Sequence, residues 1–427
     1  MNNSFPPSRC VLLAVFGWMS FAYSATAVET GQTNVPLELT FTADRDHSDP
    51  FDQIVLDVVF TEPDGVVRIV PAFWAGGRSW KVRYASGQSG VHRWSSQCSA
   101  TNDTGLHGQQ GVVEIAPYAG DNPLYRHGPI RVAANGRRFE HADGTPFLWL
   151  GDTWWMGLCH RLHFPDEFAR LAANRREKGF NVIQIVAGLY PDMPPFDPRG
   201  ANEAGWPWEQ DYRRVRPEYF DAADQRLMHL VDQGFTPCIV GAWGFYMPWM
   251  GEAKLKAHWR YLVARYAAWP VVWCAAGEAN LPWYQADGFP YDDQSTARRW
   301  CDVMRSIRAV DPWRRPLTVH PTAIHAFTAR HVVDDPALLD FDLLQTPHDG
   351  PGMYVEAVTP QAVVHSRAAD PTLPVVNGEA SYEMLHDRIP ASKPRAMFWL
   401  CMLNGAAGHT YGANGIWQVN RPGEPHV

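Results

Sequence analysis

From residue 147 onward, short apolar runs alternate with longer segments of helical periodicity. Alternation of this kind is typical of parallel strands joined by crossover helices. Eight apolar runs can be counted, which is the number of strands that closes such a sheet into a barrel. The pattern therefore predicts an α/β fold, a (β/α)8 TIM barrel, over residues 147–427. The expected strands are Phe147–Leu150, Asn181–Val186, Thr236–Val240, Val271–Cys274, Leu317–Val319, Leu343–Leu344, Val375–Asn377 and Gly408–Tyr411.

Four segments between these strands have the periodicity of amphipathic helices, and the first two are followed by glycine, a common helix stop. They are Pro165–Lys178, Asp221–Gln233, Ala253–Ala268 and Ser295–Val310. The segment after the eighth strand is different, because Asn420–Val427 contains Pro and Gly and no helical periodicity. We therefore expect the barrel to lack its eighth helix here, and the chain to be a fragment without its C-terminus.

Residues 34–118 consist of short strand-like stretches separated by turn residues, without helical periodicity. This pattern predicts an all-β sandwich, which we interpret as an accessory domain. Residues 119–146 follow as a connector in which Asn135-Gly136 and Asp143-Gly144 indicate hairpins. The expected sandwich strands are Leu37–Ala43, Ile54–Phe60, Val66–Phe73, Trp80–Tyr84, Val91–Ser96 and Val112–Ala116.

The first 27 residues have the features of a secretory signal peptide. Arg9 supplies a positive charge, Cys10 to Ala22 form a short apolar run, and Ala25-Thr26-Ala27 provides a small-residue cleavage pattern. The run is too short for a permanent membrane span, and no other apolar stretch reaches that length. We expect a secreted or periplasmic protein that is not membrane-bound in its mature form.

Composition excludes several classes of function. The net charge is −8 and no lysine-rich run occurs, so we expect no nucleic-acid partner. The cysteines are widely spread, with no CxxC spacing, which disfavours a zinc cluster. The sequence contains neither a G-x-S-x-G nucleophile elbow nor a phosphate-binding loop. We expect no metal and no other cofactor.

Two glutamates follow predicted strands at equivalent positions, each directly after a glycine. Glu278 follows the fourth strand and Glu379 follows the seventh. Residues at the C-terminal ends of barrel strands face the active site. A pair of carboxylates at this end is what a retaining glycosidase requires, one as acid and one as nucleophile. The alternative is that each glutamate caps a helix or pairs with an arginine.

Several polar and aromatic residues near strand ends are candidate substrate contacts. Asp152 ends the first strand and could bind a sugar hydroxyl, or serve as a helix cap or salt-bridge partner. Trp154, Trp243 and Trp249 could form a sugar platform or pack in the core. Asn280 is a further amide candidate.

Three histidines, His320, His348 and His409, follow the fifth, sixth and eighth strands. They lie on different strands without HxH or HxxxH spacing, so sugar or carboxylate contacts are favoured over a metal site. Tyr382 and His348 are candidate donors to Glu379, and Tyr411 on the eighth strand is a further candidate substrate contact.

Four segments of the chain stand out: Gly128–Val132 with His141–Thr153, Arg265–Asn280, Asn377–Glu379 with Tyr382-Glu383, and Gly405–Gly412 with Trp417. Together they resemble the apiosidase-like glycoside hydrolases (family 140 and its uncharacterised relatives). The resemblance covers about residues 34–427, including a small β domain that often precedes this barrel. It implies a retaining mechanism, with Glu278 as acid/base and Glu379 as nucleophile. Glu383, four residues after Glu379, is the rival nucleophile.

One position departs from this family. Its characterised members carry aspartate as the acid/base, whereas this chain has Glu278, so we do not carry apiose specificity over. The favoured interpretation is a secreted retaining glycoside hydrolase acting on a plant or microbial polysaccharide or oligosaccharide. The alternatives are a non-catalytic carbohydrate-binding barrel protein and a peptidase. The carboxylate pair disfavours the first, and the missing metal-ligand and nucleophile motifs disfavour the second.

Overall fold

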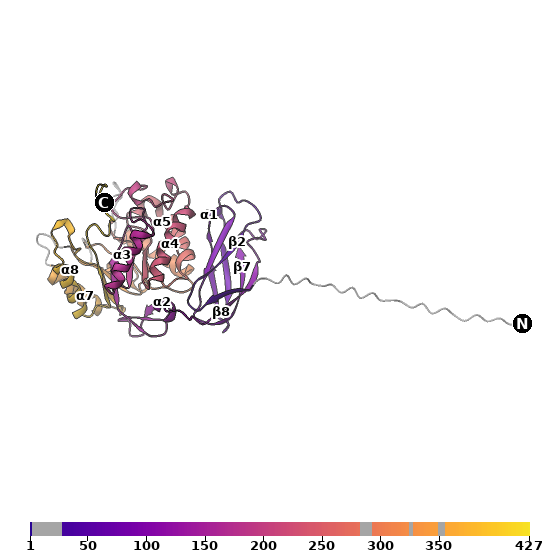
Figure 1. Cartoon of the computed structure of the whole chain (residues 1–427), viewed down its shortest axis with the longest axis horizontal. Coiled ribbons are helices and arrows are strands. Elements are labelled where there is room, and N and C mark those ends of the chain that lie inside the picture. The colour runs from indigo at the N-terminus through magenta and orange to yellow at the C-terminus, as the bar shows by residue number, and fades with distance from the viewer. Residues whose placement is uncertain (2–27, 282–292, 324–327, 349–354) are drawn as a thin grey trace.

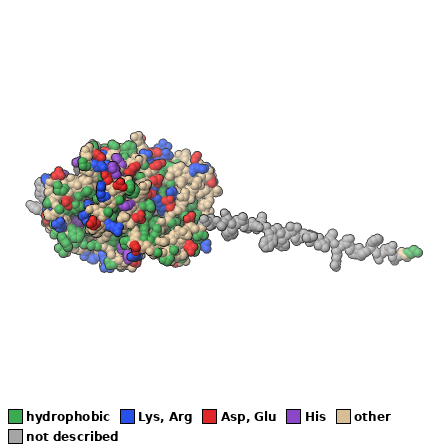
Figure 2. Space-filling view, in the orientation of Figure 1, with side chains coloured by type: hydrophobic (Ala, Val, Ile, Leu, Met, Phe, Trp, Pro, Cys, Tyr) green, Lys and Arg blue, Asp and Glu red, His purple; other side chains and the backbone are tan. Residues whose placement is uncertain are grey.

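The computed structural model describes residue 1 and residues 28–281, 293–323, 328–348 and 355–427. Residues 2–27, which make up nearly all of the expected signal peptide, lie outside the described residues. A β domain packs beside a larger α/β barrel (Figure 1). In the space-filling view, the two form one continuous body (Figure 2).

The larger unit is built on eight parallel strands, which confirms the predicted barrel. These are β12 (Trp149–Thr153), β13 (Val182–Val186), β14 (Thr236–Val240), β15 (Val272–Cys274), β16 (Leu317–Thr318), β17 (Asp342–Gln345), β18 (Val375–Glu379) and β19 (Gly408–Tyr411). Their order in the sheet is β16-β15-β14-β13-β12-β19-β18-β17. The edge strands β16 and β17 approach each other through hydrogen bonds such as Asp340 N to Leu317 O, 2.9 Å. The barrel is therefore nearly closed.

Helices cover the outside of the barrel. They are α3 (Asp166–Glu177), α4 (Pro217–Asp232), α5 (Tyr246–Tyr266), α6 (Asp293–Val310), α7 (Val355–Ala368) and α8 (Ser392–Leu403). Between β16 and β17 the described residues form only the 3-10 turns Ala329–His331 and Pro336–Leu338, in place of a crossover helix. After β19 the described residues form no further helix. None of the described helices has both the length and the apolar character needed to cross a bilayer.

The direction in which side chains point from β12 and β19 decides which residues can reach the barrel interior. Trp149 Nε1 donates to Thr410 Oγ1 at 3.0 Å, and Thr410 Oγ1 donates to Gln184 Oε1 at 2.9 Å. These three side chains from β12, β19 and β13 form a buried polar layer inside the barrel. Because side chains alternate along a strand, Asp152 and His409 point outward, toward the helices.

The N-terminal domain contains two packed sheets. A five-stranded sheet has the order β1-β8-β7-β3-β4 and a three-stranded sheet has the order β2-β6-β5. Their bounds are β1 (Glu29–Gln32), β2 (Leu37–Thr42), β3 (Leu56–Thr61), β4 (Val67–Pro71), β5 (Phe73–Trp74), β6 (Ser79–Tyr84), β7 (Gly90–Cys98) and β8 (Gln110–Ala116), with the short helix α1 (Pro50–Gln53). In the connector, α2 (Pro123–Arg126) precedes two hairpins built from β9 (Ile130–Val132), β10 (Phe139–His141) and β11 (Pro146–Phe147).

A buried ionic cluster joins the two domains. Arg83 on β6 donates to Asp224 on α4 at 2.5 Å, and Arg265 on α5 donates to both oxygens of Asp224 at 2.9 and 3.1 Å. The two guanidinium groups also lie over the ring of Phe73, 4.9 and 4.6 Å from its centroid. Glu38 and Asp221 also pair with these arginines but are more exposed, so Asp224 is the buried counterion that the two cations share, and the cluster links the β domain to the barrel wall.

Candidate active site

Glu278 and Glu379 lie close together at the C-terminal end of the barrel strands. Glu379 is the last residue of β18, and Glu278 follows β15 by a short loop. A single nitrogen, Nε2 of Gln345 at the end of β17, donates at 3.0 Å to an oxygen of each carboxylate. Two oxygens that share one nitrogen at this distance lie at most about 6 Å apart, by geometry alone. The site is therefore a close carboxylate pair.

An irregularity in β18 directs Glu379 into the barrel. The register pairs Leu344 with Asn377 and then Gln345 with Glu379, so Gly378 is one extra residue. Asn377 points outward, since its side-chain amide lies 3.4 Å from the sulfur of Cys401 on α8. On a regular strand, residues 377 and 379 would point to the same side, so Glu379 would also point outward. The β-bulge at Gly378 shifts the alternation by one residue, and Glu379 points into the barrel instead. Only glycine fits at 378, because a Cβ there would lie 2.5 Å from Leu343 Cδ1.

The loop that carries Glu278 is packed closely against Trp243. A Cβ on Gly277 would lie 2.2 Å from the indole ring, so this position also requires glycine. Trp243 Nε1 donates to Glu278 Oε2 at 3.2 Å. Glu278 itself has a φ of +41°, a conformation that costs a non-glycine residue energy and that is typical of functional sites. The backbone and the indole together fix the position of this carboxyl group.

The surroundings of Glu278 favour its protonated form. Burial raises the pKa of Glu278 to about 7, and the negative charge of Glu379 contributes in the same direction. The hydrogen bonds from Gln345 and Trp243 oppose this rise only in part. A carboxyl group with such a pKa can hold a proton near neutral pH and deliver it.

Glu379 has the opposite environment. Burial alone would raise its pKa, but the hydrogen bond from His348 and the nearby imidazoles lower it below the usual value of 4.5. His348 Nε2 lies 3.0 Å from Glu379 Oε1, and His320 Nε2 lies 3.4 Å from Oε2. Tyr382 contributes to lowering the pKa of this carboxylate in the same direction. Glu379 is thus held ionised beside a neighbour that holds a proton.

Two residues of this site were missed by the sequence analysis. Gln345, which donates to both carboxylates, is a polar residue at the end of the sixth barrel strand, and its position was the available signal. Trp155 is buried, donates through Nε1 to the hydroxyl of Tyr382 at 2.9 Å, and meets Trp243 edge-to-face with centroids 5.4 Å apart. Trp155 thus packs against Trp243, which contacts Glu278, and bonds to Tyr382, which lies beside Glu379.

Several expected substrate contacts point away from the pair. The carboxylate of Asp152 is fully buried and accepts from Arg175 at 2.6 Å and from Trp154 Nε1 at 2.7 Å. His409 packs against Phe398 on α8, with centroids 5.8 Å apart. These residues lie between the barrel strands and the outer helices, where a sugar bound at the carboxylates cannot reach them.

Tyr411 and the rival Glu383 also lie on this outer side. The hydroxyl of Tyr411 donates to Glu383 Oε2 at 2.8 Å, and both residues line a groove beside α8 together with Phe398. Glu383 is therefore paired with Tyr411, away from Gln345.

The remaining candidates have supporting positions. Asn280 is buried and its Oδ1 accepts from Thr322 N at 2.8 Å, which joins the loops after β15 and β16. Trp249 is half-buried on α5 and packs against Phe245 and Tyr246, at centroid distances of 4.9 and 5.1 Å. Across the described ranges, no group of three His, Cys, Asp or Glu is arranged to hold a metal ion.

Comparisons with known proteins match both domains. A family model described as "Apiosidase-like, catalytic domain" matches residues 133–427, and a domain of unknown function, DUF5060, matches residues 33–99. A candidate glycoside hydrolase from Bacteroides vulgatus ATCC 8482 superposes with a TM-score of 0.68 at 19% identity, over 93% of this chain and 74% of that one. A family 5 glycoside hydrolase from the same organism gives 0.57 at 24% identity, over 72% of this chain and 66% of that one. No curated protein matches the sequence.

Proposed function

Because the chain belongs to the apiosidase-like family of glycoside hydrolases, we propose that it cleaves a glycosidic bond with retention of anomeric configuration. In this proposal Glu379 is the nucleophile and Glu278 is the acid/base. The substrate is a plant or microbial polysaccharide or oligosaccharide, and the N-terminal residues direct the protein out of the cytoplasm.

The observation that carries this proposal is the amide nitrogen shared by the two carboxylates. Retaining enzymes hold their carboxyl groups about 5–5.5 Å apart, whereas inverting enzymes need roughly 6.5–9.5 Å to fit a water molecule between carboxylate and sugar. The bridge through Gln345 limits the distance between the nearest oxygens to about 6 Å. This spacing favours direct attack by a carboxylate.

The roles follow from the electrostatics of the pair. The ionised carboxylate of Glu379 attacks the anomeric carbon, and Glu278 gives its proton to the glycosidic oxygen as that bond breaks. Glu278, now ionised, then takes a proton from water, and the resulting hydroxide displaces Glu379 from the sugar. The sugar leaves with its original configuration, and both glutamates return to their starting protonation states.

The anomeric form of the first product tests the retaining assignment. A polysaccharide panel scored by release of reducing sugar identifies a substrate, and ¹H NMR then follows the anomeric proton before mutarotation. We expect the product to appear first in the configuration of the substrate. Initial appearance of the other anomer would refute the assignment of Glu379 as nucleophile.

Glu278→Gln tests the acid role. On substrates with a poor leaving group, this change should lower kcat/KM by about 10³-fold, because no proton reaches the departing oxygen. On aryl glycosides whose phenolate departs unaided, glycosyl transfer to Glu379 should be nearly unaffected. Pre-steady-state release of the phenol measures this step directly. An equal loss on both substrate classes contradicts the role of Glu278 as general acid.

The pH dependence of kcat/KM should be bell-shaped. Activity requires protonated Glu278, so it is lost as pH rises through a pKa of about 7. Activity also requires ionised Glu379, so it is lost as pH falls through a pKa below 4.5. With activated substrates, Glu278→Gln should remove the basic limb and leave the acidic limb. A basic limb that persists in this variant would belong to another group.

A further inference from the structure

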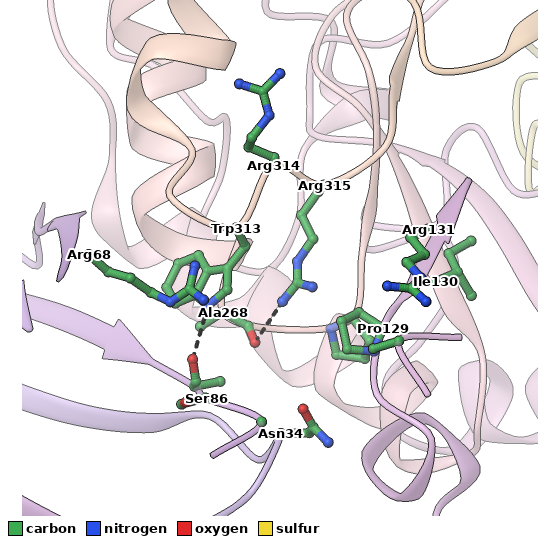
Figure 3. A pocket seen from close by; sticks show the side chains of 14 residues that line it. Asn34, Arg68, Ser86, Pro129, Ile130, Arg131, Ala268, Trp313, Arg314 and Arg315 are labelled. Atoms are coloured by element: carbon green, nitrogen blue, oxygen red, sulfur yellow. Dashed lines mark hydrogen bonds between the residues drawn. The ribbon is translucent and has the colours of Figure 1, made fainter. Parts of the chain in front are cut away.

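A cavity of about 390 Å³ lies where the β-sandwich, the connector and the barrel meet (Figure 3). The barrel contributes Ala268 and Pro270 from the loop before β15 and Arg315 from the loop before β16. Such loops lie at the N-terminal ends of the barrel strands. The cavity is therefore at the end of the barrel opposite Glu278 and Glu379, apart from the candidate active site.

The charge of this cavity contrasts with that of the whole chain. Four arginines and no aspartate or glutamate line it, although the chain has a net charge of −8. Arg68 pairs with Glu62 at 2.6 Å, and Arg131 pairs with Glu140 at 3.0 Å. Arg314 is exposed, and its guanidinium is turned away from the other three (Figure 3).

Arg315 is a buried cation that forms no ion pair with any carboxylate among the described residues. Its Nε donates to Ala267 O at 2.9 Å and its Nη2 to Ala268 O at 3.4 Å, both backbone carbonyls. Burial lowers the pKa of Arg315 to about 10; the charge of Asp311 raises it and that of Arg68 lowers it. A buried charge without a close counterion is unfavourable, so an anion in the cavity would stabilise this arrangement.

We propose that this cavity is a second carbohydrate site that binds the carboxylate of an acidic sugar, a uronic acid residue. Guanidinium groups match carboxylates through two parallel hydrogen bonds. The wall around them includes the half-buried ring of Trp313 and the apolar side chains of Pro129 and Ile130. Free phosphate is also an oxyanion that guanidinium groups bind. The apolar walls and the volume, which is typical of small-molecule pockets, favour a sugar ring that carries a carboxylate.

This site goes beyond the proposed hydrolysis and does not depend on it. It is built partly from the β-sandwich, through Ala85 and Ser86, and partly from the barrel. Trp313 Nε1 donates to Ala85 O at 2.9 Å, which closes one side of the cavity across the domain boundary. An acidic polysaccharide held here would be kept on the enzyme at a distance from the bond being cleaved.

Calorimetric titration of the full chain carrying Glu379→Gln tests the proposal, because that protein does not consume the ligand. The probes are glucuronate and galacturonate oligosaccharides, neutral gluco-oligosaccharides and inorganic phosphate. We expect saturable binding of at least one uronate series. Binding of phosphate as tightly as the best uronate, or equal binding of the neutral series, would overturn the assignment.

Two matched pairs of variants separate this cavity from the catalytic cleft. Arg131→Gln should weaken uronate binding about tenfold, whereas Arg314→Gln, with the same charge change, should have little effect. Ala142 is an exposed residue of the cavity wall. Ala142→Asp places a competing carboxylate at the mouth and should abolish binding, and Ala142→Asn controls for size. Uronate binding that is unchanged in both Arg131→Gln and Ala142→Asp overturns the proposal, whatever the fate of the catalytic assignment.

Discussion

Glu379→Gln is expected to lower kcat by roughly 10⁴- to 10⁶-fold, because under the proposed mechanism the variant lacks the nucleophile that forms the covalent intermediate. The amide keeps the size of the side chain and can still accept hydrogen bonds from Gln345 and His348, so the fold should persist. Circular dichroism and the unfolding temperature check this. The loss should apply to activated and unactivated substrates alike, in contrast to that of Glu278→Gln.

A matched control lies four residues away. Glu383→Gln makes the same chemical change in a residue that pairs with Tyr411 on the outer side of the barrel, and it should leave kcat nearly unchanged. A mechanism-based fluorosugar followed by peptide mass spectrometry should place the label on Glu379. A label on Glu383, or inactivation by Glu383→Gln with wild-type activity in Glu379→Gln, would reverse the assignment.

Asp224→Asn is expected to reduce the free energy of unfolding by about 3–5 kcal/mol, because it removes the buried carboxylate that Arg83 and Arg265 share and leaves only the more exposed Glu38 and Asp221 as their partners. Arg83 and Arg265 both depend on this carboxylate, and each lies beneath aromatic rings from which water is excluded. Urea unfolding followed by tryptophan fluorescence measures the loss.

Asp221 provides the comparison, because it pairs with the same Arg265 from a position where its side chain is 60% exposed. Asp221→Asn should cost less than about 1 kcal/mol, as exposed ion pairs usually do. Equal losses in the two variants would mean that burial does not determine the contribution of this cluster.

The barrel could be predicted from sequence because its strands are buried on both faces. β14 was predicted at its observed bounds, since Thr236–Val240 is bounded by Gly234 and a following glycine. The strand β1 was not predicted, because Glu29–Gln32 is polar and its pairing with β8 depends on the rest of the sheet. The crossover between β16 and β17 lacks an α-helix in the described residues, a departure that local periodicity does not reveal.

The two glutamates could be proposed as a pair from the sequence because both follow strands in the same way, and the structure places them close together. Whether a side chain near a strand end points into the barrel or toward the helices was predicted less well. Asp152, His409 and Tyr411 are all near strand ends, but each occupies the outward phase of its strand. Trp154 was the predicted contact, whereas Trp155, one residue later, contacts Tyr382 and Trp243 beside the pair.

The pKa difference between the glutamates and the bridge through Gln345 could not be predicted from sequence. Both depend on distances between side chains from several strands, and tertiary packing sets these distances. His320 shows the same point, since its sequence position suggested several partners and the structure places it 3.4 Å from Glu379.

The extra residue in β18 has a consequence for how proteins with this fold are compared. If Gly378 paired with Gln345 as an ordinary strand residue, regular alternation would turn Glu379 toward the helical layer. In an alignment, a homologue with a regular strand here and one with the bulge would show the same two acidic columns, with no gap between them. They would nevertheless differ in whether this glutamate faces the barrel interior. Strand register, rather than residue identity alone, should therefore be the criterion when activity is assigned to relatives of this chain.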